Sequence, residues 1–191
     1  MTQNIPGTKI LTVALCWLLL AKGLSAQFPA DTMKLTTFSA TLLERLIRDG
    51  IDSVRKAKGL ELLSNDSSLY FAAADQAAYL QYQRTITHRQ PVESKSTVQK
   101  RAEYYGGKGY LCGENIAASW IEQLITEKGG KPYRNFTYRQ MADDFIRLWV
   151  NSSGHYTNII NPLYGYTGVA VTLHPKTKRI VVVQVFGYLK D

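Results

Sequence analysis

Apolar side chains recur at intervals of three and four residues along the first half of the chain, which is the spacing of amphipathic helices. The clearest run spans residues 38–59, and its apolar positions are Leu42, Leu43, Leu46, Ile47, Ile51 and Val54. Charged residues fill the other face of this segment, and Gly59 ends it. Residues 38–59 are therefore predicted to form a long helix with one buried face.

The next two segments carry the same spacing. Asp66 is the best candidate N-cap for a second helix that runs to about residue 82. Its apolar stripe contains small residues, which suggests close packing against another element: Leu69, Ala72, Ala73, Ala77 and Leu80. Residues 97–105 predict a short third helix, which a pair of glycines closes.

The second half of the chain begins with a segment that is harder to assign. Residues 120–135 allow one or two helical turns followed by a Gly/Pro loop, and they are expected to form an insertion near the rim of a site. Residues 137–149 predict a fourth helix in which Asp143 pairs with Arg147. The side chains expected to face inward are Met141, Phe145, Leu148 and Trp149.

Three segments predict β-strands. Residues 110–118 are mostly apolar, although Gly113, Glu114 and Asn115 interrupt the run. Residues 166–173 and 179–188 are convincing strands joined by a short polar turn, so they predict an antiparallel hairpin. Helices first and a hairpin last indicate an α+β architecture.

The N-terminus has the pattern of a secretory signal peptide over residues 1–26, with a basic start, an apolar run and small residues at its end. An uncleaved anchor is the alternative. Residues 27–35 would then form a short tail and residues 36–191 the domain, with no membrane span after cleavage. Cleavage lowers the formal net charge from +8 to +6 because it removes Lys9 and Lys22. No dense Lys/Arg block indicates nucleic acid. The expected location is extracellular or periplasmic.

Candidate chemistry lies at three separated positions. Residues 149–162 follow the fourth helix and are expected to break at Gly154 and to present His155 just beyond the break. His88 follows the exit of the second helix, and Glu114 is a carboxylate inside an apolar strand. A buried carboxylate needs a partner. The third histidine of the mature chain, His174, lies at the hairpin turn and is expected to be exposed.

Several interpretations of these residues remain open. His88, His155 and Glu114 could hold Zn²⁺ or another divalent cation with one position left for water, or they could form a metal-free acid–base pair. The structural alternatives are a histidine that caps its own loop and an edge-strand glutamate that points to water. Cys112 as a nucleophile is a further option, although a neighbouring carboxylate raises the pKa of a thiol.

Four segments in order resemble the motifs of one family. They are residues 51–60 of the first helix, the alanine-rich second helix with His88, the run Gly113-Glu114-Asn115-Ile116-Ala117, and a tryptophan-to-proline motif over residues 149–162. Residues 168–169 and 184–187 are similar to the closing strands. The chain is thus identified as a member of the CAP superfamily of cysteine-rich secretory proteins, antigen 5 and pathogenesis-related proteins, in its short bacterial form.

The resemblance implies an α-β-α sandwich with a central antiparallel sheet, and a groove where His88, Glu114 and His155 converge. Groove residues beside them are expected to include Asn115, Ser152 and Tyr156. The family's usual set is two histidines and two acids, with the second acid three residues after a tryptophan. Here that position is Ser152, so the tetrad lacks an acid unless Asp143 or Asp144 substitutes for it.

Two functional hypotheses follow. The first is a secreted binding module for a peptide, glycan or lipid, with tyrosines around the groove: Tyr110, Tyr156, Tyr164 and Tyr166. The second is an extracellular hydrolase, a peptidase or esterase, that uses a metal or a His/Glu acid–base pair. A shared fold does not decide between them.

Overall fold

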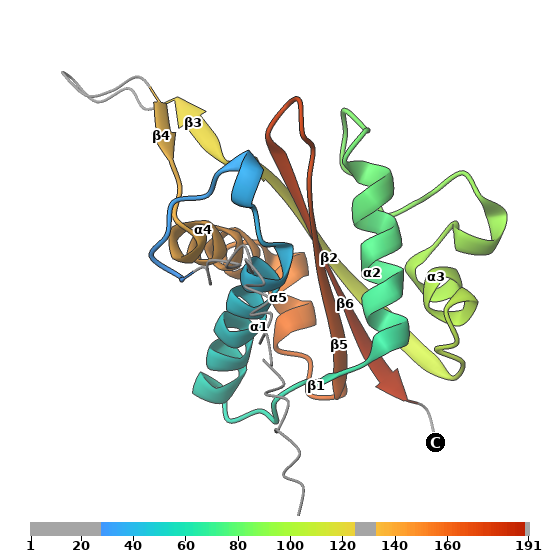
Figure 1. Ribbon diagram of the computed structural model, residues 1–191. Helices are drawn as coiled ribbons and strands as arrows, with labels where there is room; N and C mark the ends of the chain where they lie inside the picture. Colours follow the sequence, from blue (N-terminus) through green and yellow to red (C-terminus); the bar gives the residue numbers. More distant parts are fainter. Residues whose placement is uncertain (1–27, 125–132, 190–191) are drawn as a thin grey trace, which may run out of the picture.

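The computed structural model describes residues 28–124 and 133–189, and it arranges them as helices packed on both faces of a sheet (Figure 1). The helices are η1 (Leu35–Thr37), α1 (Ala40–Ala57), α2 (Ser67–Leu80), η2 (Glu93–Lys95), α3 (Val98–Tyr104), α4 (Tyr138–Val150) and α5 (Ser153–Ile159). The strands are β1 (Ser64–Asn65), β2 (Tyr110–Trp120), β3 (Glu122–Leu124), β4 (Tyr133–Asn135), β5 (Tyr166–Leu173) and β6 (Arg179–Leu189).

The main sheet has the strand order β1-β5-β6-β2. The pairs β5–β6 and β6–β2 are antiparallel, as predicted, and the two-residue strand β1 adds a parallel pair to the outside of β5. In the β2–β6 register Glu114 lies opposite Val185. Strand β2 is thus the outermost long strand, and Glu114 lies in its first half.

Two hydrophobic cores confirm the α-β-α sandwich. Helices α1, α4 and α5 lie on one face of the sheet and α2 and α3 on the other (Figure 1). Successive side chains of β2 pack alternately into the two cores, because side chains of a strand alternate between the faces of the sheet. Ala117 belongs to the core under α1 and α4, and Ile116 belongs to the core under α2.

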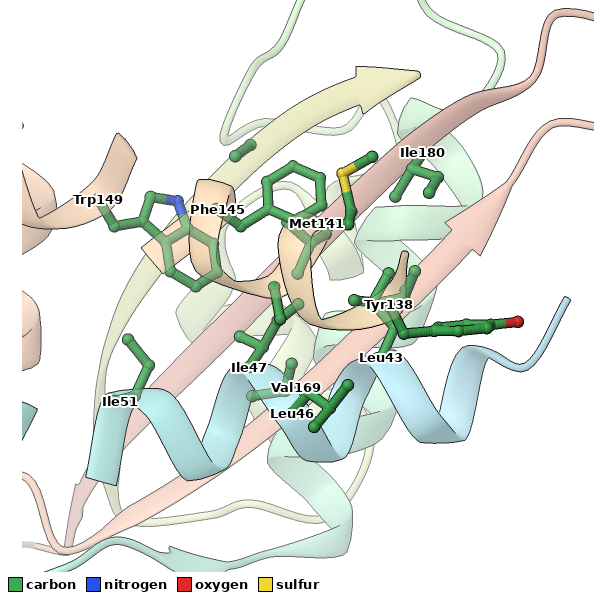
Figure 2. Packing of buried hydrophobic residues seen from close by; sticks show 14 of the residues in the cluster. Leu43, Leu46, Ile47, Ile51, Tyr138, Met141, Phe145, Trp149, Val169 and Ile180 are labelled. Carbon is green, nitrogen blue, oxygen red and sulfur yellow. The ribbon is translucent and has the colours of Figure 1, made fainter. Parts of the chain in front are cut away.

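The core under α4 shows where the helical periodicity misleads. Met141, Phe145 and Trp149 are buried against α1 and the sheet (Figure 2), whereas Leu148 is 50% exposed rather than inward. The buried positions of α4 follow a spacing of four, and residue 148 lies about 100° away from residue 149 around the helix. The expected ion pair also differs, because Arg147 bonds to Asp144 at 2.7 Å rather than to Asp143.

Two segments adopt a different structure from the predicted one. Residues 153–159 form helix α5, so Gly154 and His155 lie in its first turn and not in a loop. Residues near 121–124 form strand β3, which pairs with β4, in place of the expected helical turns. Residues 125–132, and the predicted signal peptide, lie outside the described residues.

The segment expected to be a tail packs on the domain where it is described. Met33 is fully buried, and its amide donates to the carbonyl of Phe136 at 2.9 Å. A bridge between Thr32 and Thr137 continues this contact. Among the described residues, no helix has both the length and the apolar character needed to cross a membrane.

Arg55 joins α1 to the segment that carries the candidate site. Its side chain is buried, and its guanidinium donates to four backbone carbonyls at 2.8–3.0 Å: those of Glu61, Ile159, Asn161 and Tyr164. Ile159 is the last residue of α5, whose final carbonyls have no partner within the helix. Arg55 therefore anchors the end of α5 and the start of the hairpin to α1.

Replacing Arg55 by Met should lower the free energy of unfolding by about 3 kcal/mol or more, because four backbone carbonyls, one of them in a fully buried hydrogen bond, lose their donor. Urea unfolding followed by circular dichroism measures this change. The matched control is Arg45→Met on the exposed face of α1, which should change stability by no more than about 0.5 kcal/mol. Equal stability of the two variants would contradict the anchoring role.

Candidate functional site

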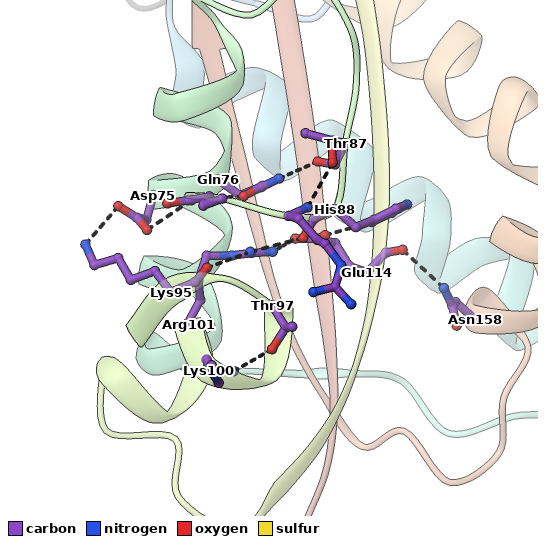
Figure 3. A network of polar contacts seen from close by, with 12 residues as sticks. Asp75, Gln76, Thr87, His88, Lys95, Thr97, Lys100, Arg101, Glu114 and Asn158 are labelled. Carbon is purple, nitrogen blue, oxygen red and sulfur yellow. Dashed lines mark hydrogen bonds and ion pairs between the residues drawn. The ribbon is translucent and has the colours of Figure 1, made fainter. Parts of the chain in front are cut away.

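Glu114 is the buried centre of the candidate site. Its side chain is 1% exposed, and it projects from β2 toward the layer of α2 and α3. One carboxylate oxygen bonds to Nδ1 of His88 at 2.8 Å, and the other bonds to the guanidinium of Arg101 (Figure 3). The alternative in which Glu114 points to water is therefore wrong, and the carboxylate has the partners that burial requires.

Arg101 is the site residue that the sequence pattern did not reveal. It lies on α3 and is fully buried. Its guanidinium also donates to the backbone carbonyls of His88, at 3.3 Å, and Lys95, at 3.2 Å. Arg101 thus holds both the carboxylate and the loop that carries the histidine. In the sequence it is one basic residue on a short helix, with no motif around it.

Buried amide side chains hold the loop that follows α2. Gln76 on α2 donates to the carbonyl of Thr87 at 2.6 Å, and Gln90 donates to the side-chain oxygen of Gln76 at 2.9 Å (Figure 3). Both glutamines are buried. These contacts flank His88 on both sides, so its imidazole is presented from a braced backbone although the side chain is 56% exposed.

His155 reaches the site on α5, from the opposite helical layer. The Asn115 side chain donates to the carbonyl of His155 at 3.0 Å. Asn158 in turn donates to the Asn115 side chain at 2.8 Å and to the carbonyl of Glu114 at 3.3 Å. Gly113 permits this close approach, because a Cβ there would lie 2.5 Å from the hydroxyl of Tyr164.

The other predicted groove residues have mixed outcomes. Asn115 is buried and positions His155 through its backbone, and half-buried Ser152 and Tyr156 flank His155 on the same turn, joined by a 2.8 Å backbone hydrogen bond. The ring of Tyr110 is buried against Tyr166, with its hydroxyl bonded to Asp66, and the ring of Tyr164 packs on Phe186. These three tyrosines serve packing.

The two imidazoles have pKa values that move in opposite directions. The hydrogen bond to Glu114 raises the pKa of His88 above its usual value. Burial lowers the pKa of His155, and the nearby charge of His88 lowers it further. His88 therefore keeps its proton to a higher pH than His155 does.

The described residues do not fit a three-ligand metal site. No group of three His, Cys, Asp or Glu side chains in residues 28–124 and 133–189 is arranged to hold an ion. Both oxygens of Glu114 are engaged by His88 and Arg101. Asp144 pairs with Arg147 on α4, so it does not supply the missing acid. Zinc binding stays a prediction that this geometry does not favour.

Cys112 is unsuited to act as a nucleophile. Its thiol is half-buried, and burial together with the carboxylates of Glu103 and Glu114 raises its pKa to about 12. The backbone amide of Cys112 donates a hydrogen bond to the side-chain oxygen of Gln99 on α3 at 3.2 Å. A thiol that keeps its proton at neutral pH is a poor nucleophile.

Comparison with known proteins identifies the fold. The family model described as "CAP: Cysteine-rich secretory protein family" matches residues 49–186. No curated protein matches. An outer surface protein from Borrelia burgdorferi superposes with a TM-score of 0.60 at 20% identity, covering 84% of this chain and 99% of that one. An extracellular protein with an SCP domain from Bacillus anthracis gives 0.59 at 22%, covering 78% and 41%.

A third solved structure agrees. A cysteine-rich secretory protein from Staphylococcus aureus superposes with a TM-score of 0.54 at 15% identity, covering 78% of this chain and 39% of that one. The chain thus spans nearly all of the Borrelia protein but well under half of the other two. At these identities the likeness establishes the fold.

The opposite pKa shifts can be measured by NMR titration of the histidine ring protons. We expect His88 to titrate above pH 6.5 and His155 below it. Replacing Glu114 by Gln should lower the pKa of His88, because its hydrogen-bonded carboxylate is gone. An unchanged His88 titration in that variant would show that Glu114 does not set its charge.

Zinc titration by calorimetry tests the metal expectation. We expect binding weaker than micromolar, because Arg101 neutralises the carboxylate that would be the third ligand and only two imidazoles remain. The double variant His88→Ala/His155→Ala is the control. Micromolar or tighter binding that disappears in this variant would contradict the prediction and show that Glu114 rearranges to bind the ion.

Proposed function

Because the chain belongs to the CAP family of cysteine-rich secretory proteins, we propose that it is a secreted ligand-binding protein whose ligand contacts His88 and His155, with Glu114 buried beneath His88 as its support. The observation that carries this proposal is an exposed imidazole on a rigid, buried support. The side chain of His88 is 56% exposed, while Glu114 and Arg101 beneath it are 1% and 0% exposed. Preorganisation of this kind lowers the entropy cost of binding.

The charges of the cluster favour a ligand with an anionic or hydrogen-bond-accepting group. Arg101 neutralises Glu114, so protonation of His88 leaves the exposed tip of the cluster cationic. Nδ1 of His88 is used by Glu114, which leaves Nε2 as the donor directed to a ligand. A carboxylate or phosphate on a peptide, glycan or lipid would suit this donor.

An extracellular setting is consistent with two of the structural neighbours, which are named as an outer surface protein and an extracellular protein. The signal-peptide pattern of residues 1–26 supports the same setting for this chain. We propose secretion on these two grounds. Cys112 is a free cysteine, so the stability of the described domain comes from its two cores and not from a disulfide.

A second candidate function, acid–base hydrolysis, is favoured by one observation. Two neighbouring histidines with pKa values moved apart are the arrangement in which one acts as acid and the other as base. Neutral His155 would take a proton from water, and protonated His88 would give one to the leaving group. The substrates would be peptides or esters, and no metal is required.

Single substitutions separate the two functions. For a binder, His88→Ala should weaken binding of a phosphate- or carboxylate-bearing ligand about tenfold, because the cationic donor is lost, and no peptide or ester should be turned over. For a hydrolase, His155→Ala and Glu114→Gln should each lower kcat at least about a hundredfold. Calorimetry with peptide, saccharide and fatty-acid probes measures binding. Assays with chromogenic esters and peptides measure turnover.

The control is Arg147→Ala, which removes an exposed cation from α4 and leaves the cluster intact. Binding should also weaken as the pH rises through the pKa of His88, because the imidazolium loses its charge. Affinity that is the same in His88→Ala and across that pH range would overturn the binding role of the cluster. Turnover that survives in both His155→Ala and Glu114→Gln would exclude the hydrolase.

A further inference from the structure

A hollow lies away from the His88 cluster, at the other end of β2. It encloses about 530 Å³ between the residues that follow α2, the end of β2 and the turn between β5 and β6. In Figure 1 the end of α2 and the β5–β6 turn both lie at the top of the view. Ala118 and Trp120 line the hollow, four and six residues beyond Glu114, which is roughly 13–20 Å along the strand.

Two large aromatic rings stand in this hollow with much of their surface open to solvent. Tyr82 is 69% exposed and Trp120 is 48% exposed, and they come from different elements. The ring of Tyr82 is oriented by an edge contact with His174, at 5.3 Å between centroids. Exposed rings that line a concavity from separate elements indicate a binding surface.

The polar groups of the hollow are donors. Nδ1 of His174 accepts from the amides of Lys176, at 3.2 Å, and Thr177, at 3.1 Å. The proton of the neutral imidazole is therefore on Nε2, which can donate to a ligand. Arg84 and Arg179 add two guanidinium groups, and no Asp or Glu is among the described residues that line the hollow. The lining is positively charged.

Backbone groups of the segment after α2 and of the β5–β6 turn are already bonded within the protein. Arg179 donates to the carbonyls of Leu80, at 3.0 Å, and Gln83, at 2.6 Å. The amide and carbonyl of His174 are bonded to Arg179 and Lys178 within the turn. An extended peptide binds mainly through a row of backbone groups. Here the recognition groups are rings, guanidinium groups and side-chain amides.

We propose that this hollow binds an acidic oligosaccharide, a chain of pyranose rings that carry carboxylates. The apolar face of one ring packs on the indole of Trp120, and a neighbouring ring packs on Tyr82. Arg84 and the free edge of the Arg179 guanidinium pair with the carboxylates. Sugar hydroxyls bond to Nε2 of His174 and to the side-chain amides of Gln81 and Gln83.

The test is a calorimetric titration of the protein purified from expression of the full chain, with tetragalacturonate, tetramannuronate and a chondroitin tetrasaccharide as probes. At least one should bind, and its fully methyl-esterified form should bind about tenfold more weakly because the carboxylates are masked. Trp120→Ala and Arg84→Ala should each weaken binding about fivefold to tenfold. Trp120→Phe should keep most of the affinity, because it retains a ring.

Two matched controls have exposed side chains of the same types elsewhere. Tyr104→Ala removes an exposed ring from α3, and Arg147→Ala removes an exposed guanidinium from α4. Both should bind within about twofold of the unmodified protein. His88→Ala should also bind normally, so this proposal and the function proposed for the His88 cluster fail separately.

Three outcomes would overturn the proposal. The first is that none of the three acidic tetrasaccharides binds. The second is that binding is the same in Trp120→Ala and Arg84→Ala as in the control variants, which would place the saccharide on another surface. The third is that an acidic hexapeptide containing tryptophan binds more tightly than every saccharide and loses affinity in Trp120→Ala, which would make the hollow a peptide site.

Discussion

The candidate site depends on one buried ion pair, between Glu114 on β2 and Arg101 on α3. Removing two charges from water costs several kcal/mol for each ion, so the pair persists only because each charge neutralises the other and both have further hydrogen bonds. Arg101 also holds the backbone of His88, and Glu114 holds its imidazole. Loss of either charge would therefore remove the support of the histidine as well as leave its partner buried and unpaired.

The position of β2 explains how residues from both helical layers reach one part of the sheet. It is the outermost long strand of the sheet, so the helical layers on the two faces can approach each other across its free edge. His88 comes from the layer of α2 and α3, and His155 comes from α5 on the opposite face. A buried amide side chain holds the backbone on each side of the sheet. Gln76 bonds to the loop that carries His88, and Asn115 of β2 bonds to the carbonyl of His155. The result is that each of the two histidines is held in place by hydrogen bonds from buried side chains.

This support also separates the charge states of the pair. The carboxylate beneath His88 favours its protonated form, and burial together with that charge favours the neutral form of His155. Such a pair can bind an anion or exchange protons with a substrate, and the fold is compatible with both. The arginine-lined hollow near Trp120 lies at the other end of the same strand, so β2 contributes residues to both the His88 cluster and the hollow.

The amino-acid pattern predicts the helices α1 and α2, the β5–β6 hairpin and three residues of the candidate site. Periodicity predicts regular elements because it reflects one-sided burial, and the family motifs pointed to His88, Glu114 and His155. The tertiary structure alone decided that Arg101 completes the site, that residues 153–159 are helical, and that Leu148 faces solvent. These features arise from contacts between residues far apart in the chain, such as Asn115 with His155, and no local pattern records them.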